Sequence, residues 1–144
     1  MFSVFNIAGS GLTLHRTWLD AVADNIANIN TAVPGGEAAY QERFVVAQAQ
    51  SSNTMGGSKI SGGANGTTPQ GVKIAGVEFG SSDGELRHEP NNPLADANGY
   101  VRYPAMNLAD QMTNMIAAQR GYQANLSVIE RARAAYEAAI NLGK

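Results

Sequence analysis

The stretch that decides the fold lies near the C-terminal end, where residues 107–142 read NLADQMTNMIAAQRGYQANLSVIERARAAYEAAINL. Large side chains recur there at spacings of four and three without a break, which is the a/d pattern of a coiled-coil helix. We call these positions the C-terminal stripe: Leu108, Met112, Met115, Gln119, Tyr122, Leu126, Ile129, Arg133, Tyr136 and Ile140. The pattern predicts one helix of roughly 50 Å, begun by Asn107 as N-cap and stopped by Gly143.

A second helical stretch opens the chain, from Ser3 to about Ile29. Its apolar side chains keep helical spacing and share one face with His15: Phe5, Ala8, Leu12, Leu19, Val22, Ile26 and Ile29. Two glycines in its first turns each weaken a helix by about 1 kcal/mol, which leaves its start open between Ser3 and Thr13. Asparagines near its end and the run that begins at Pro34 stop it.

The region between the helices has the composition of short strands and loops. Residues 40–47 and 72–79 carry the β-branched and aromatic side chains of two strands, and Gly76 marks a bulge where their alternation changes phase. Residues 51–71 are rich in Gly, Ser, Asn and Thr, which predicts a mobile loop. Residues 89–100 hold two Pro and an Asn-Gly, which predicts an extended segment closed by a tight turn.

These patterns divide the chain into three regions: an N-terminal helix (1–33), a β-rich middle with its loop (34–104) and a C-terminal helix (105–144). The fold class is mainly α, with the two long terminal helices packed as a coiled-coil-like pair and a small β-rich, loop-rich region between them. Neither helix can bury its apolar face alone. We expect the two ends to pair with each other and then with other copies of the chain.

The charge content argues for a surface that other proteins cover. Charged residues make up 15% of the 144, against about a quarter in an ordinary domain, and the net charge is −2. Between Leu108 and Glu130 the only charged residues are Asp110, Arg120 and Glu130, and small uncharged side chains fill the other positions. An exposed helix normally carries charged pairs there. A monomeric bundle with an Ala-rich helix is the alternative reading.

The composition also excludes several classes of partner. The chain has no block of Lys and Arg, so nucleic acid is not an expected partner. It has no Cys, which excludes disulfides and thiolate metal sites. Its first residues have no basic segment before the apolar ones, so we expect no cleaved signal peptide, and no apolar run approaches the roughly 18 residues of a membrane span.

Two stretches resemble the axial proteins of the bacterial flagellum, in particular the subunits of the proximal rod in the basal body. The first is LDAVADNIANINT (19–31), which is similar to the family pattern NxANxxT at Asn25, Ala27, Asn28 and Thr31. The second runs from NPLADANGYV (92–101) through residues 106–144. Many rod proteins follow the Thr with a Gly and an aromatic residue, whereas here residues 32–39 intervene. That departure favours one branch of the family and leaves their conformation open.

The resemblance implies a structural, non-enzymatic subunit of the rod, the shaft that crosses the periplasm and transmits torque. Its expected partners are other copies, other rod proteins and components of the membrane ring and export gate at the rod base, and it needs no cofactor and no small-molecule substrate. Export by the flagellar type III apparatus is expected. The residues expected at subunit contacts are Leu12, Leu19, Val22, Asn25, Ile26, Asn28, Thr31, Leu108, Met112, Met115, Gln119, Tyr122, Leu126, Ile129, Tyr136 and Ile140.

Catalytic and metal chemistry finds little support in the residues. His15 lies about 140° around the helix from Asp20, so an acid/base set is disfavoured against a packed polar residue. His88 has no spaced second ligand cluster of the kind zinc requires. Two other functions stay open: an export-linked adaptor that does not polymerise, and a cell-wall hydrolase that would use Glu85 and Glu89 as its carboxylate pair.

Overall fold

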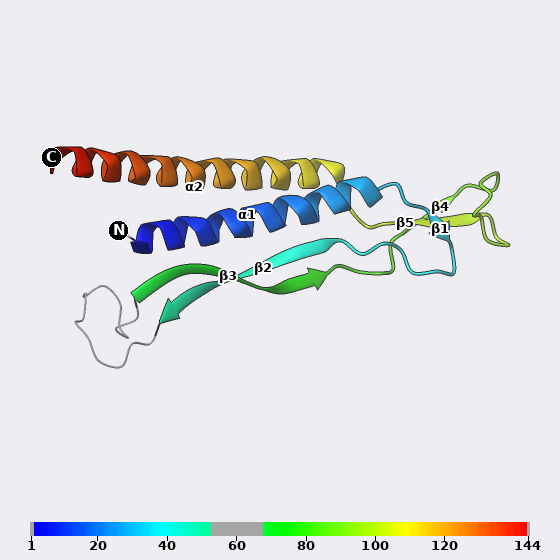
Figure 1. The fold of residues 1–144 in the computed structure, drawn as a ribbon. Coiled ribbons are helices and arrows are strands. Elements are labelled where there is room, and N and C mark those ends of the chain that lie inside the picture. Colours follow the sequence, from blue (N-terminus) through cyan, green and yellow to red (C-terminus); the bar gives the residue numbers. More distant parts are fainter. Residues whose placement is uncertain (1, 53–67, 144) are drawn as a thin grey trace.

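The computed structural model describes residues 2–52 and 68–143. The elements in chain order are α1 (Phe2–Asn28), β1 (Val33–Pro34), β2 (Arg43–Ser52), β3 (Thr68–Phe79), β4 (Glu85–His88), β5 (Tyr100–Tyr103) and α2 (Leu108–Leu142). They form an elongated molecule in which α1 lies between α2 and the β2–β3 hairpin, while the other three strands make a small sheet at one end (Figure 1). The prediction of two terminal helices around a β-rich middle is confirmed.

Both helices are continuous. α1 begins at Phe2 and runs through both of its glycines, so the later start that these glycines suggested is wrong. It ends at Asn28, before the run at Pro34. In α2 the predicted cap is confirmed, because the Asn107 side chain accepts a hydrogen bond from the Ala109 amide at 2.8 Å. Gly143 ends this helix as predicted and donates its N–H to the Ile140 carbonyl.

The helices pack antiparallel, with the two described chain ends at the same end of the molecule (Figure 1). Two contacts define the register of the pair: Gly11 faces Asn125, and Asn25 bonds Gln111. Residue numbers therefore rise along α1 as those of the facing residues in α2 fall. The same register places Phe2 opposite Ala134. The last two turns of α2, residues 135–142, therefore extend beyond the described beginning of α1.

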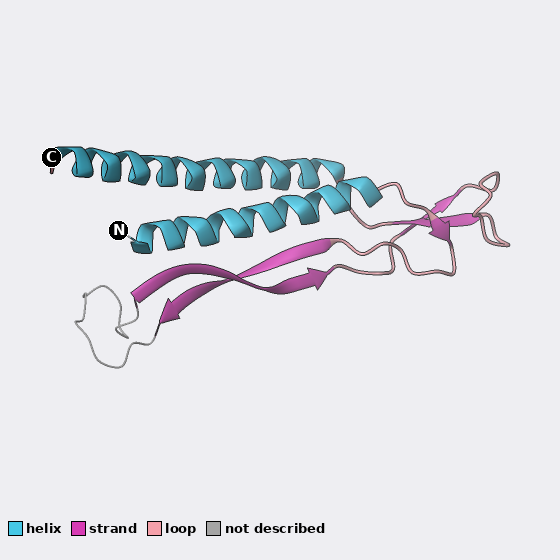
Figure 2. Ribbon diagram, in the orientation of Figure 1, coloured by secondary structure: helices cyan, strands magenta, loops and turns pink. Residues whose placement is uncertain are grey.

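The β2–β3 hairpin is a long twisted ribbon that packs on α1 (Figure 2). Both strands are longer than predicted, because their ladder continues past the apolar residues into the polar end at Ser52 and Thr68. Main-chain hydrogen bonds need no apolar side chains, so the pattern could not show this extension. The expected bulge is confirmed, since Val46 pairs with Gly76 while Ala47 pairs with Ile74, which leaves Ala75 unpaired.

The loop expected over residues 51–71 is wrong at both edges, where 51–52 and 68–71 belong to strands. Residues 53–67, which held the rest of that prediction, lie outside the described part of the chain. Gly71 takes a positive φ of 101° beside the Ser10 side chain, where a larger residue would collide with α1.

The small sheet has the order β1-β5-β4, with antiparallel pairing throughout. None of these three strands was predicted, because they are too short for a period to be read from their residues. Residues 89–99 join β4 to β5 through successive turns, so the extended segment expected there is wrong. The predicted Asn-Gly turn is present: Gly99 has a φ of 79° and donates its N–H to the Asp96 carbonyl. The sequence left the conformation of residues 32–39 open, and the structure shows that two of them, Val33–Pro34, form β1.

Few apolar side chains of the described residues are buried, and most of them are small: Ala8, Ala21, Val22, Ala39, Val101 and Ala118. The largest fully buried side chain is Gln111, a polar one. Neither α1 nor α2, the helices of the described residues, carries the apolar stretch that crossing a bilayer requires. A core of this size stabilises a chain of 144 residues weakly.

Candidate assembly interface

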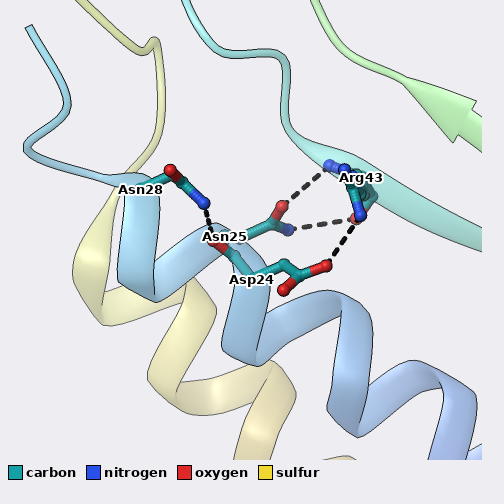
Figure 3. A network of polar contacts seen from close by, with 4 residues as sticks. All are labelled: Asp24, Asn25, Asn28 and Arg43. Carbon is teal, nitrogen blue, oxygen red and sulfur yellow. Dashed lines mark hydrogen bonds and ion pairs between the residues drawn. The ribbon is translucent and has the colours of Figure 1, made fainter.

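A polar cluster joins α1, α2 and the β2–β3 hairpin near the C-terminal end of α1. The Asn25 side chain is 1% exposed. Its Nδ2 donates to the Arg43 carbonyl at 3.0 Å, and its Oδ1 accepts from the Arg43 amide at 2.9 Å. One side-chain amide thus replaces a neighbouring strand for the first residue of β2 (Figure 3). Beside it, the Arg43 guanidinium pairs with Asp24 at 2.7 Å, an exposed contact of small energetic value.

The same amide reaches α2. Asn25 Nδ2 also donates to Gln111 Oε1 at 3.1 Å, and Gln111 Nε2 donates to Glu42 Oε1 at 2.6 Å. Gln111 is as buried as Asn25, so neither amide can find water in place of its partner. Since a buried polar group without a partner costs about 1 to 3 kcal/mol, the two residues depend on each other. The cluster fixes the register of α1, α2 and the start of β2 at one point.

The rest of the motif closes the helix locally. Asn28 Nδ2 donates to the Asp24 carbonyl within α1 (Figure 3), and Thr31 donates its N–H to the Asn28 carbonyl at 3.0 Å. The Thr31 hydroxyl also bonds Asn28 Oδ1 at 3.3 Å. The residues of the motif therefore have different roles: Asn25 joins elements, whereas Asn28 and Thr31 close the end of the helix.

Two glycines allow the helices to approach closely. A Cβ at Gly11 would lie 2.6 Å from Asn125 Oδ1, and a Cβ at Gly121 would overlap the ring of His15. Each glycine therefore receives a side chain of the opposite helix. The close neighbour that Gly121 admits belongs to the same chain.

The face of α2 that meets α1 is small and polar, and it differs from the C-terminal stripe. It runs through Gln111, Ala118 and Asn125, which are seven residues apart, with Gly121 beside them. Sequence reasoning did not assign Gln111, Ala118 and Asn125 to this contact because it followed the large side chains. Their heptad spacing was the signal that could have found them.

Most of the predicted contact residues in α1 and just after it are buried or half-buried. Val22 and Asn25 are buried, Thr31 is exposed, and four are half-buried: Leu12, Leu19, Ile26 and Asn28. In α2 most of the predicted contact residues are exposed. Met115, Tyr122 and Ile129 are half-buried, and six stripe positions of the predicted set are exposed: Leu108, Met112, Gln119, Leu126, Tyr136 and Ile140. The C-terminal stripe is therefore not confirmed as the contact between α1 and α2.

Of the groups weighed for chemistry, His15 lies on α1, whereas Glu85, His88 and Glu89 lie together on β4 or directly after it. His15 packs against Trp18, with ring centroids 6.0 Å apart, and its buried Nδ1 has no hydrogen-bond partner in the described structure. Glu85 pairs with Arg87 at 3.2 Å. Glu89 accepts a hydrogen bond from the Tyr103 hydroxyl, and desolvation together with this carboxylate raises the pKa of Tyr103. Within residues 2–52 and 68–143, no three metal-ligating side chains gather.

Both ends of the chain match family models. The model described as "Flagella basal body rod protein" matches residues 5–32, and the one described as "Flagellar basal body rod FlgEFG protein C-terminal" matches residues 97–142. These ranges contain α1 from Phe5 onward and all of α2, together with the motif at the end of α1 and strand β5. The similarity thus covers the two helices that build the polar cluster.

Complete proteins are similar over the whole chain. The flagellar basal-body rod protein FlgC of Borreliella burgdorferi is 32% identical, with 97% of this chain and 95% of that protein aligned. FlgC of Salmonella typhimurium is 33% identical over 100% of this chain and 98% of its own length. FlgC of Bacillus subtilis is 30% identical over 99% and 98%.

Proposed function

The chain belongs to the family of the flagellar basal-body rod protein FlgC, and from that premise we propose that it builds the proximal part of the rod through the exposed surfaces of its terminal helices. It is a structural subunit of the flagellar basal-body rod. The finer roles, transmission of torque and a position in the part of the rod that crosses the periplasm, follow from the same premise. No catalysis is required of it.

One observation carries the assignment of the interface. α2 exposes large apolar side chains along its whole length: Leu108, Met112, Ile116, Leu126, Val128, Tyr136, Ile140 and Leu142. An exposed helix of an ordinary monomer carries charged residues at such positions, and contiguous apolar surface marks sites of association. Five of these side chains belong to the C-terminal stripe and supply its intersubunit part: Leu108, Met112, Leu126, Tyr136 and Ile140. Small and polar residues hold α1 within the chain.

The proposed division of labour follows from this arrangement. Residues 1–33 and 105–144 form the core of the assembly, in which α2 pairs in a coiled-coil-like manner with helices of other subunits. The middle region, 34–104, faces neighbouring subunits away from that core. Val22 and Asn25 act indirectly at the interface, because they hold α1 and β2 in position for the exposed residues.

The partners are other rod proteins of the basal body, further copies of this chain and the membrane-ring and export-gate components at the rod base. The alternative is an adaptor of the export system that uses the same helices and does not polymerise. The apolar side chains of α2 favour the subunit, because they extend over both ends of a helix of 35 residues. A small adaptor contact would cover one part of it.

The experiment is deletion of the gene followed by complementation with a tagged copy and purification of hook-basal bodies. We expect loss of swimming in the deletion strain, and recovery of the tagged chain in the purified rod as a stable component. A chain that restores swimming while it is absent from purified basal bodies would support the adaptor. Purified cell wall digested by the isolated chain would revive the hydrolase.

A further inference from the structure

A small groove lies where α1, α2 and the start of β2 meet. Its volume is about 300 Å³, at the lower limit of the range for ligand pockets, so it holds a group of the size of one side chain. Two aromatic rings line it, Trp18 of α1 and Phe44 of β2. Trp18 is half-buried and Phe44 is 45% exposed, so solvent reaches both rings. We call this hollow the aromatic groove.

One carboxylate of the aromatic groove has no ion-pair partner among the described residues. Glu42, which directly precedes β2, accepts a hydrogen bond from Gln111 through Oε1, whereas its Oε2 accepts none within that part of the chain. The other charged residue of the lining, Arg43, is already paired with Asp24 at 2.7 Å. Within residues 2–52 and 68–143, the groove therefore carries one uncompensated negative charge.

Asn114 adds a second acceptor to the wall that α2 forms. It lines the groove three residues after Gln111, and therefore on the same face of the helix. Gln111 is committed, because it bonds both Asn25 and Glu42. The Asn114 side chain is half-buried and makes no hydrogen bond to any residue that the structure describes. Its amide oxygen is thus available to a donor that enters the groove.

We propose that the aromatic groove receives the guanidinium group of an arginine from a neighbouring rod subunit. A guanidinium stacks on aromatic faces, and its planar fork donates to a carboxylate and to a second acceptor at once. Trp18 and Phe44 supply the rings, and Glu42 and Asn114 supply the acceptors. An ammonium group has neither the flat face nor the fork, so lysine fits the groove less well.

Assembly gives the site its purpose. A subunit that packs over the groove removes water from the Glu42 carboxylate, and a buried charge without a partner is unfavourable. An arginine carried by that subunit supplies the missing charge, so the contact accepts a matching neighbour and disfavours one that lacks it. The inference rests on the proposed function, because the arginine comes from another subunit of the rod.

The only Trp of the chain lies in this groove, so its fluorescence reports on the site. We would titrate the purified chain with N-acetylarginine amide at constant ionic strength, and repeat the titration with the citrulline and lysine compounds. Citrulline has nearly the same shape as arginine and no charge. We expect a saturable change of the Trp18 signal with the arginine compound, and an affinity for it roughly tenfold above that for citrulline, because charged hydrogen bonds are the stronger ones.

Glu42→Gln tests the charge alone. The new amide oxygen still accepts the bond from Gln111, so the polar cluster keeps its contacts. We expect the affinity for N-acetylarginine amide to fall roughly tenfold. Glu130→Gln removes a carboxylate from an exposed position of α2 outside the groove and is the matched control, with unchanged affinity expected. Equal affinities for arginine and citrulline, equal effects of the two substitutions, or tighter binding of lysine would each overturn the proposal.

Photo-crosslinking identifies the occupant in the rod. Benzoylphenylalanine would replace Phe44 in a tagged chain, and purified basal bodies would be irradiated, digested and analysed by mass spectrometry. We expect adducts on a neighbouring subunit within a few residues of an arginine, and a lower yield after substitution of that arginine by Gln. Adducts confined to the same chain, or to a stretch without arginine, would overturn the assignment of the occupant.

The proposed function fails in a different way. If the tagged chain is absent from purified basal bodies, the subunit assignment is wrong, whereas the titration with N-acetylarginine amide still measures the groove itself. If the chain is present and the parent chain does not distinguish arginine from citrulline, the rod assignment stands and the arginine site is wrong.

Discussion

Replacing Asn25 by Ala tests whether one buried amide holds the three layers together. The change removes three hydrogen bonds: two to the main chain of Arg43 and one to Gln111 Oε1. Each bond contributes about 1 kcal/mol net, and the partners left behind are partly or fully buried. We therefore expect a loss of roughly 3 kcal/mol in the free energy of unfolding, which is a large share of the stability of a small domain.

The assay is urea unfolding of the purified chain, followed by far-UV circular dichroism and by fluorescence of Trp18, which lines the same small cavity as Asn25 and Arg43. With a slope of about 1 to 3 kcal/mol per molar urea, the midpoint should fall by roughly 1 to 3 M. The matched control is Asn28→Ala. That amide bonds only within α1 and its end, so the loss should stay below about 1 kcal/mol.

The reasoning is refuted if Asn25→Ala and Asn28→Ala shift the midpoint equally. A double-mutant cycle with Gln111→Ala sharpens the test. If the two amides depend on each other, the double variant loses less than the sum of the single variants, by about 1 kcal/mol or more. Strict additivity would show that Gln111 is held by Glu42 alone.

Four further predictions concern the helices and the segment between the hairpin strands. Leu126→Asp should leave the isolated fold intact, because the side chain is 40% exposed, yet abolish swimming by placing an unpaired carboxylate in a subunit contact. Gly121→Ala should lower the free energy of unfolding by about 1 to 3 kcal/mol, and with it the melting temperature, because the new methyl group meets His15. Gly9→Ala should raise the free energy of unfolding by about 0.5 to 1 kcal/mol, because Ala favours the helix and nothing lies within 4 Å of the added Cβ. Deletion of residues 56–64 should preserve swimming, because loop-closure entropy changes slowly with length.

Each of these has an outcome that contradicts it. A motile Leu126→Asp strain would remove that residue from the interface, provided that blotting shows export of the variant. Equal effects of the two glycine substitutions on melting would show that the helix pair opens freely at Gly121. A deletion of 56–64 that is exported and not motile would mean that this segment makes contacts in the rod.

The sequence predicted the helices well because their signals are local. Asn107 caps α2 through its own side chain, and the bulge beside Gly76 follows from a change of phase within one strand. The exposed row of α2 was also visible as a periodic pattern. What that pattern could not reveal was its partner, because large apolar residues at heptad spacing look alike whether they face the same chain or another.

The contact within the chain was hidden by its chemistry. Gln111 and Asn25 are polar residues that become buried because they satisfy each other, and their sequence separation of 86 residues leaves no local trace of it. Gly11 weakens α1 when the helix is considered alone, yet Asn125 occupies the space that it leaves. The sequence therefore suggested a late helix start where the tertiary contact keeps the helix whole.

The position of α1 between the other two layers governs how the subunit bears load. The hairpin and α2 lie on different sides of α1, so a force on one reaches the other mainly by shear across this helix (Figure 1). The hairpin is fastened to it by hydrogen bonds at two separate heights: the Val72 amide donates to Ser10 Oγ at 3.0 Å, and Arg43 is held by Asn25. The two points lie roughly 22 Å apart along the helix, which resists sliding and tilting alike. A variant that loses either attachment point should give a rod that twists more easily under torque, while the number of subunits in the rod stays the same.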